Sequence, residues 1–311
     1  MSADSPMPPQ PGQPYTTLET EKVNPTTTDI DRMNAQEIVQ AMNAEDAHVA
    51  EAVRQTLPQI ASAIEAISAR LRRGGRLIYI GAGTSGRLGA LDAVECPPTF
   101  NVSPEQIIGC IAGGSFALTQ AAEDVEDSAE AGMADLARLV VTEADAVVGM
   151  SASGRTRYVL GAVAYAREHG AFTIGLACNL NTPLEQAVDI TIAPVVGPEV
   201  IAGSTRLKAG TAQKMVLNIL STGSMILLGK TFGNMMVDVQ ATNHKLHLRA
   251  LEIVRRSTGL EHEAAEALLA TCGGEVKTAI LAARANIAPE LARARLARHN
   301  NILRAALEAT L

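Results

Sequence analysis

The stretch LIYIGAGTSGRLGALDAVECPPTF, residues 77–100, decides how this chain is expected to fold. Its first part, LIYIGA (77–82), is an apolar run typical of a buried strand, and a helical pattern follows it. Between the two, residues 81–86 match the spacing G-x-G-x-x-G that occurs in dinucleotide-binding proteins. Thr84 and Ser85 are instead hydroxyl residues that suit a single phosphate group. The stretch therefore predicts a strand–loop–helix unit and leaves two kinds of ligand to be weighed.

The same alternation of strand and helix continues along the chain. The expected strands are 77–82, 106–112, 146–151, 172–178 and 190–195, and helical patterns fall at about 86–95, 116–122, 128–140, 155–169 and 205–228. Nearly continuous apolar strands separated by helices predict a parallel sheet that is covered on both faces, which is the α/β class.

Changes in composition divide the chain into four parts. Residues 1–14 are rich in Pro and Ser and are expected to form a disordered tail. Residues 15–59 are expected to form an N-terminal helical segment, and 60–232 the sheet domain. Residues 245–311 have a helical pattern with a break near 272–274, which predicts a small C-terminal helical domain.

Composition excludes several classes of function. The 311 residues carry a formal charge of −7, with 3% aromatic residues and no Trp, so the chain lacks the basic surface and stacking side chains of nucleic-acid-binding proteins. The most apolar run, 215–228, is shorter than a membrane span of about 20 residues and is expected to be a buried helix. No basic region followed by an apolar one begins the sequence, so we expect no signal peptide.

The four cysteines are far apart, without a C-x-x-C pair, which favours neither a zinc site nor a disulfide framework. Cys110 and Cys178 lie in apolar runs and are expected to be buried thiols. This usage suits a reducing compartment, so a cytoplasmic location is expected. His244 and His247 have the spacing H-x-x-H, but no nearby carboxylate completes a metal site, and we expect no metal.

A second loop repeats the device of the first. VVGMSASGRTRYVLGA (147–162) again gives a strand, small residues, Ser-Gly-Arg and a helix. A strand that leads through glycine into a helix directs free backbone N–H groups and the positive end of the helix dipole at one point, where a phosphate binds well. The expected phosphate-binding residues are Gly83, Thr84, Ser85, Gly86, Ser151, Ser153, Gly154 and Thr156. The alternative, that these hydroxyls only cap helices, stays open.

A dinucleotide fits less well. It requires an acidic residue at the end of the second strand to hold a ribose, but that strand ends IAGGSF (111–116). A nucleotide-binding P-loop is excluded as well, because no Gly-Lys-Ser/Thr ends either loop.

Several carboxylates are candidates for acid–base chemistry. Glu95 is expected at the end of a helix, where the rigid segment Cys-Pro-Pro would hold it still. The cluster EDVED (123–127) precedes another helix, and spacing alone does not choose among its four acids. A third segment, 197–214, is expected to form another wall of the site, although ordinary helix-end charges are the alternative. Its candidate substrate-binding residues are Glu199, Ser204 and Lys208.

Six motifs together resemble one family, the N-acetylmuramic acid 6-phosphate etherases of the sugar-isomerase (SIS) domain proteins. They are TTLETEKVNPTTTDIDRMNAQEIVQAMNAED (16–46), LIYIGAGTSGRLGALDAVECPPTF (77–100), IAGGSFALTQAAEDVEDS (111–128), VVGMSASGRTRYVLGAV (147–163), GSTRLKAGTAQKMVLNILST (203–222) and GNMMVDVQATNHKLHLR (233–249). The resemblance covers nearly everything after the tail, and the Pro-rich tail is the main departure from it.

The resemblance implies a five-stranded parallel sheet in three αβα layers, a homodimer, and a sugar phosphate held by the two loops. It also implies cleavage of the lactyl ether at carbon 3 of the sugar without a metal or redox cofactor. In this family the first catalytic glutamate precedes Cys-Pro-Pro, here Glu95, and the second precedes Asp-Ser, here Glu126. We assign Glu95 as the proton donor to lactate and Glu126 as the base at carbon 2, and we expect burial beside the phosphate to keep Glu95 protonated.

Two other functions remain as alternatives. One is an aldose–ketose isomerase of a hexose phosphate, which would use the same loops but would need no leaving-group acid. The other is a sensor without catalytic activity, although residues 1–75 contain no clear basic helix-turn-helix. The sequence does not choose between wall recycling and uptake as the source of the sugar. It also leaves open whether the terminal helices, or His244 and Lys245, take part in the site.

Overall fold

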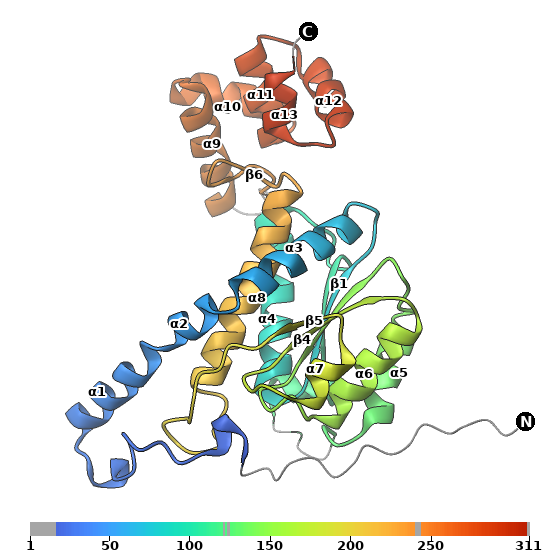
Figure 1. Cartoon of the computed structure of the whole chain (residues 1–311). Helices are drawn as coiled ribbons and strands as arrows, with labels where there is room; N and C mark the ends of the chain where they lie inside the picture. Colours follow the sequence, from blue (N-terminus) through green and yellow to red (C-terminus); the bar gives the residue numbers. More distant parts are fainter. Residues whose placement is uncertain (1–16, 121, 123–124, 240–243, 310–311) are drawn as a thin grey trace, which may run out of the picture.

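The computed structural model describes residues 17–120, 122, 125–239 and 244–309. Its centre is a five-stranded parallel sheet with the strand order β2-β1-β3-β4-β5 (Figure 1). The strands are β1 (Leu77–Gly81), β2 (Ile107–Ile111), β3 (Ala146–Met150), β4 (Phe172–Leu176) and β5 (Ile190–Ile192). Each begins within one residue of its predicted start, and the predicted α/β class is confirmed.

Helices cover both faces of the sheet. On one face lie α3 (Leu57–Leu71), α4 (Gly83–Phe100) and α8 (Lys208–Leu227), and on the other lie α5 (Ala129–Arg138), α6 (Arg157–Glu168) and α7 (Pro183–Ala187). Alternate strand residues supply the two cores: Tyr79 belongs to the first and Ile80 to the second, and both are fully buried. The predicted buried helix at 215–228 is the apolar part of α8.

Two sequence-based expectations about helices are wrong. The helix that carries Glu95 does not end there but continues through Pro97 and Pro98 to Phe100, and Asn101 in the left-handed conformation ends it. The hydroxyl of Thr99 donates to the Glu95 carbonyl oxygen at 2.8 Å, which adds a side-chain bond in the turn that contains the prolines. The helix expected at 116–122 is instead a short 3-10 helix, Gly114–Leu118.

The cysteines are unpaired, and Cys178 is buried as expected. Cys110 is only half-buried, because it lies on the edge strand β2.

The N-terminal segment forms an arm. The 3-10 turns Glu19–Glu21 and Ile30–Arg32 precede α1 (Ala35–Asp46) and α2 (Val49–Arg54), and α1 begins with a full capping box between Asn34 and Glu37. Within α1 no residue is buried, and Figure 1 shows the helix projecting away from the sheet. Helix α1 therefore has little packing within its own chain. The predicted tail, residues 1–14, lies outside the described residues.

The C-terminal helices form a separate core. A short hairpin, β6 (Thr231–Phe232) and β7 (Met235–Met236), precedes α9 (His244–Thr258), α10 (His262–Thr271), α11 (Val276–Ala285), α12 (Pro289–Arg298) and α13 (Leu303–Glu308). They lie beyond the amino edge of the sheet (Figure 1). The predicted break at 272–274 separates α10 from α11. The domain boundaries proposed from sequence stay a prediction, and that at residue 60 falls inside α3.

Two glycines allow α5 and α6 to approach closely. An ideal Cβ on Gly161 would lie 2.2 Å from the carbonyl oxygen of Ala129, and one on Gly132 would lie 1.9 Å from that of Tyr158. Because α6 follows the second hydroxyl loop directly, this crossing sets where that loop sits.

We predict that Gly161→Ala destabilises the protein by about 3 kcal/mol despite the better helix propensity of Ala, because the new methyl group meets backbone. Chemical denaturation measures the loss. Gly223→Ala is the matched control, since the nearest atoms to its Cβ would all belong to the side chain of Ile64, with the terminal Cδ1 at 2.5 Å, rather than to backbone. Equal stability of the two variants would contradict this account of the crossing.

Candidate active site

The strand order reverses between β1 and β3. The chain leaves β1 to form β2 on one side, and β3, β4 and β5 all lie on the other. The loops that follow β1 and β3 therefore diverge at the carboxyl edge of neighbouring strands, and open α/β sheets bind ligands at such a switch point. Both predicted phosphate loops are brought together at this position.

The first loop is shaped by its glycines. Gly83 has φ of +52°, and Gly81 and Gly86 pack so closely that a Cβ on Gly86 would lie 2.6 Å from the Gly81 carbonyl oxygen. This brings the first turn of α4 directly against the end of β1. Ser85 is buried and its hydroxyl donates to Oε1 of Gln213 at 2.9 Å, whereas Thr84 is half-buried. The hydroxyl of Ser85 thus joins α4 to α8.

The second loop holds three hydroxyls in one cluster. Oγ of Ser151 lies 2.8 Å from Oγ1 of Thr156 and 3.2 Å from Oγ of Ser153. Ser151 Oγ also accepts from the Gly154 amide at 3.0 Å. Gly154 has φ of +67° and is close to Thr182, where a Cβ would lie 2.5 Å from the Thr182 Cβ. The hydroxyls are therefore held in fixed positions at the start of α6.

Glu199 has a structural role that the sequence did not suggest. It is fully buried, and its two carboxylate oxygens accept from the amides of Lys208 and Ala209, both at 2.9 Å. Burial raises the pKa of Glu199, while these amides and the Lys208 charge oppose the rise. The carboxylate caps α8. Ser204, half-buried, lies in the segment that enters this helix.

Lys208 is likewise engaged within the protein. Its side chain is 3% exposed, and Nζ lies 2.5 Å from Oε2 of Glu45 at the end of α1. Burial raises the pKa of Glu45, but hydrogen bonds from Lys208, Thr26 and Asn24 and the charge of Lys208 outweigh burial and lower the pKa to about 2. The pair fastens the base of the N-terminal arm to the start of α8.

Glu126 lies beside the second loop. Its carbonyl oxygen accepts from the amide of Tyr158 at 3.0 Å, so the turn at residues 125–127 rests on the first turn of α6. The side chain of Glu126 is exposed. Among the other acids of the cluster, Asp127 is exposed, whereas Glu123 and Asp124 lie outside the described residues.

Glu95 lies far from both loops of its own chain. It is 12 positions beyond Gly83 on α4, about 18 Å along the helix axis. Its side chain is exposed, so the burial expected for it is not found. One turn earlier, the buried carboxylate of Asp92 accepts from Tyr79 at 2.8 Å and from Asn218 at 2.6 Å. These bonds fix α4 against β1 and α8 and so fix the position of Glu95.

Two buried amides complete the site, and sequence reasoning missed both. Gln213 accepts from Ser85, and its Nε2 has no hydrogen-bond partner among the described residues. Asn179, just beyond β4, donates to the Ala152 carbonyl oxygen at 2.9 Å and accepts from the Glu19 amide at 2.8 Å. The signal available in the sequence for both amides was a polar residue within an otherwise apolar pattern.

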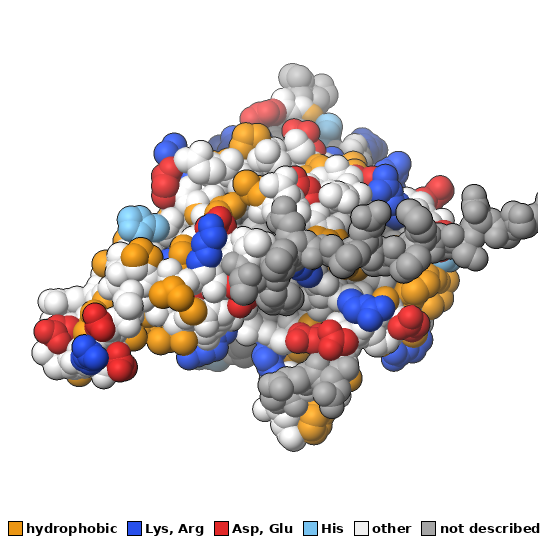
Figure 2. All heavy atoms as spheres, turned by 60° about the horizontal axis from the view of Figure 1, so that its bottom comes forward, with side chains coloured by type: hydrophobic (Ala, Val, Ile, Leu, Met, Phe, Trp, Pro, Cys, Tyr) orange, Lys and Arg blue, Asp and Glu red, His pale blue; other side chains and the backbone are white. Residues whose placement is uncertain are grey.

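The residues that the structure describes contain no cluster of three His, Cys, Asp or Glu side chains suited to a metal ion. His244 and Lys245 are exposed in the first turn of α9. In the same described residues, no helix combines the length and apolarity that crossing a bilayer requires. Figure 2 looks toward the carboxyl edge and shows charges of both signs scattered among uncharged polar and backbone atoms.

Three family descriptions match parts of the chain. "Glucokinase regulatory protein N-terminal SIS domain" matches residues 59–167, "SIS domain" matches 116–222, and "C-terminal lid domain of glucokinase regulatory protein" matches 233–275. A structure described as a phosphosugar isomerase involved in capsule formation, from Bacteroides fragilis, is similar in fold. Its TM-score is 0.51 at 20% identity, over 68% of this chain and 98% of that one.

Relatives of known name match almost the whole chain. An N-acetylmuramic acid 6-phosphate etherase of Rubrobacter xylanophilus is 57% identical over 280 residues, which are 90% of this chain and 93% of the relative. An N-acetylmuramic acid 6-phosphate etherase 1 of Vibrio cholerae is 53% identical over 292 residues, 94% of this chain and 97% of the relative.

The lowered pKa of Glu45 predicts an acid-sensitive fold. A depressed carboxylate pKa stabilises the folded state above the ordinary value of 4.5, and this contribution is lost as the pH falls from 4.5 to about 2. We expect Glu45→Gln to cost about 3 kcal/mol at pH 7, because it leaves the Lys208 ammonium buried without a counter-ion. Unfolding of the variant should then depend less on pH in this window.

Denaturant titrations at several pH values measure this. Glu51→Gln, which breaks an exposed pair with Arg54, is the control and should change little. A Glu45→Gln variant as stable as the wild type at pH 7 would show that the pair does not fasten the arm.

Proposed function

Because this chain belongs to the family of N-acetylmuramic acid 6-phosphate etherases, we propose that it cleaves the D-lactyl ether at carbon 3 of N-acetylmuramic acid 6-phosphate. The products are N-acetylglucosamine 6-phosphate and D-lactate. The observation that carries the proposal is the pair of loops at the switch point, where Thr84, Ser151, Ser153 and Thr156 surround the starts of α4 and α6. Hydroxyls and helix N-termini suit the 6-phosphate of such a sugar.

The proposed reaction is an elimination followed by an addition, so the enzyme is a carbon–oxygen lyase. In the open-chain sugar the aldehyde at carbon 1 makes the proton at carbon 2 removable. Glu126 takes this proton, and the electron pair forms a double bond to carbon 3 as the lactate oxygen leaves. Glu95 donates a proton to that oxygen. Water then adds to carbon 3 of the unsaturated aldehyde, and the chemistry needs no electron transfer and no cofactor.

Binding of the phosphate, away from the reacting carbons, provides the positioning. It holds the open chain so that carbon 2 faces Glu126, whose turn rests on the same helix that the second loop begins. Binding energy gained at a remote group can lower the barrier in this way. We also propose a cytoplasmic location, in keeping with four unpaired cysteines.

We further propose that the active form is a homodimer in which Glu95 serves the loops of the partner subunit. About 18 Å of helix separates Glu95 from the first loop of its own chain. Around it, α4 exposes apolar side chains: Leu91 is 50% and Val94 65% exposed. The arm helix α1, which buries none of its residues within its own chain, also exposes Val39. A second copy would cover these surfaces and bring a glutamate to each site.

The direct test is release of lactate from N-acetylmuramic acid 6-phosphate by the purified protein. Fructose 6-phosphate serves as the competing substrate for an isomerase. We expect lactate release from the first and no conversion of the second. Ser153→Ala should raise KM more than it lowers kcat, because it weakens phosphate binding. Turnover of fructose 6-phosphate without lactate release from the muramic acid substrate would overturn the proposal.

Mixing two inactive variants tests the shared site. Glu95→Gln and Glu126→Gln should each abolish lactate release while keeping the fold. After subunit exchange, an equal mixture should recover about a quarter of wild-type activity, since half of the dimers are mixed and each contains one intact site. Native mass spectrometry confirms that exchange has occurred. Exchanged but inactive mixtures would place both glutamates of a site on one chain, and full activity of either variant alone would remove that residue from the mechanism.

A further inference from the structure

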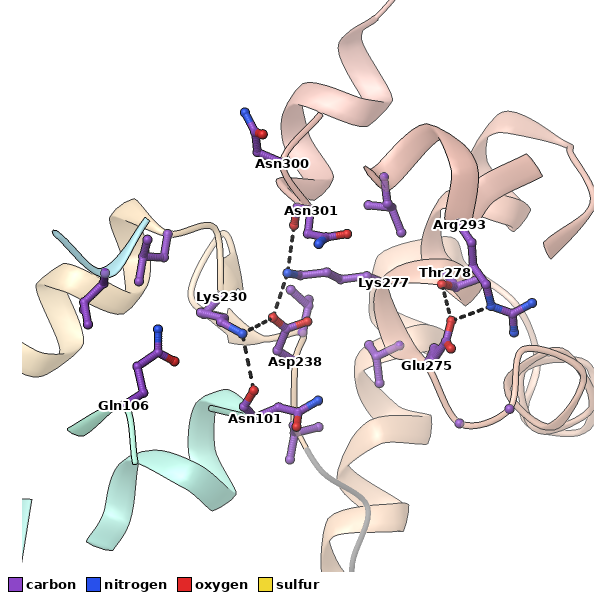
Figure 3. Close-up of a pocket in the computed structure, with 18 residues that line it drawn as sticks. Asn101, Gln106, Lys230, Asp238, Glu275, Lys277, Thr278, Arg293, Asn300 and Asn301 are labelled. Atoms are coloured by element: carbon purple, nitrogen blue, oxygen red, sulfur yellow. Dashed lines mark hydrogen bonds and ion pairs between the residues drawn. The ribbon is translucent and has the colours of Figure 1, made fainter. Parts of the chain in front are cut away.

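A cleft lies at the amino edge of the sheet, opposite the hydroxyl loops (Figure 3). Its volume is about 790 Å³, within the range of small-molecule sites. Asn101 and Gln106 line it from the sheet domain, and Asp238, Lys277 and Asn301 line it from the C-terminal region. None of the residues assigned to the etherase site lines this cleft, so its contents are a separate question.

Two lysines in the cleft share one carboxylate. Oδ2 of Asp238 lies 2.8 Å from Nζ of Lys277 and 3.1 Å from Nζ of Lys230. Figure 3 shows the two ammonium groups converging on Asp238 from different elements: Lys277 extends from α11 and Lys230 from the chain just before β6. Each also donates to a main-chain carbonyl oxygen, that of Asn301 at 2.8 Å and that of Asn101 at 3.4 Å.

The charges of the cleft do not balance. The remaining charged residues that line it, Arg293 and Glu275, form a pair of their own at 2.8 Å. Three cations therefore face two carboxylates, and the surplus positive charge belongs to the group formed by Lys230, Asp238 and Lys277.

Lys277 is held where a positive charge is unfavourable. Its side chain is 8% exposed, and it is the second residue of α11, at the positive end of the helix dipole. Burial lowers the pKa of Lys277, and the charge of Asp238 opposes this. A bound anion would supply the second negative charge, since the two lysines share the single carboxylate of Asp238.

We propose that this cleft binds a small hydroxylated organic anion, a phosphate ester or carboxylate, whose charged group lies between Lys230 and Lys277. The amide side chains of Gln106, Asn300 and Asn301, which also line the cleft, suit the hydroxyls of such a molecule. Because its walls come from both parts of the chain, the ligand bridges the sheet domain and the C-terminal helices.

Methyl NMR of the full-length protein tests the site separately from the hydroxyl loops, since Val239 and Val276 line the cleft. The probes are glucose 6-phosphate, gluconate, inorganic phosphate and uncharged glucose. We expect saturable shifts of these methyl signals with glucose 6-phosphate or gluconate, which distinguishes the ester from the carboxylate. Weaker binding is expected of inorganic phosphate, and none of glucose.

Variants assign the charges. Lys230→Met should weaken binding about tenfold or more. Lys277→Met should weaken it to a similar extent, provided that the variant folds. Asp238→Asn should tighten binding, because it frees both ammonium groups. Arg298→Met is the control: it removes an exposed cation of the same helical region that does not line the cleft, and affinity should not change. Unshifted methyl signals, equal saturation by glucose, or wild-type affinity in Lys230→Met would each overturn the proposal.

Discussion

The reversal of strand order between β1 and β3 is the constraint on which the rest of this structure depends. Two neighbouring parallel strands end at the same edge, and their chains then turn to opposite sides. Each turn leads into a helix, so the starts of α4 and α6 come together at this edge. Gly81, Gly86 and Gly154 permit this, because a side chain at any of them would meet backbone or Thr182. The phosphate binding proposed for this edge would thus follow from topology and from a few missing Cβ atoms.

The length of α4 imposes the second constraint. A helix that starts at the phosphate loop and spans one face of the sheet must end at the opposite edge, and the prolines at 97 and 98 do not shorten it. A glutamate near its end cannot also reach the start. The network around Asp92 ties the helix to β1 and α8 one turn before Glu95. If both glutamates act on one sugar, the second must come from another copy, and the exposed apolar residues beside Glu95 are where such a copy would pack.

Sequence patterns predicted the sheet well, because all five strands are short apolar runs bounded by glycine or polar turns, and apolar periodicity reports burial directly. The positions of the two loops were also predictable, because the triplet Ser-Gly-Arg follows a strand in both. Patterns do not reveal contacts that join distant parts of the chain. Glu199 and Lys208 stay predicted substrate residues, but the structure adds that the first caps α8 and the second pairs with Glu45, 163 positions away. Nothing local distinguishes a capping glutamate from a binding one. The prediction that the helix ends at Glu95 was wrong. Proline often ends a helix, but here the packing of α4 against β1 and α8 outweighs the cost of the two prolines.

Two charged side chains at the start of α8 are engaged within the protein rather than directed at a ligand. Lys208 is neutralised by Glu45, and the carboxylate of Glu199 is bound by two amides, so neither projects its charge into the site. The phosphate would then be held by dipoles and hydroxyls, whose strength depends on orientation rather than on net charge. The cleft at the other edge is built in the opposite way, with surplus ammonium groups and no hydroxyl loop. The two anion sites proposed for this fold would thus follow different electrostatic rules, and only the first is positioned by the order of the strands.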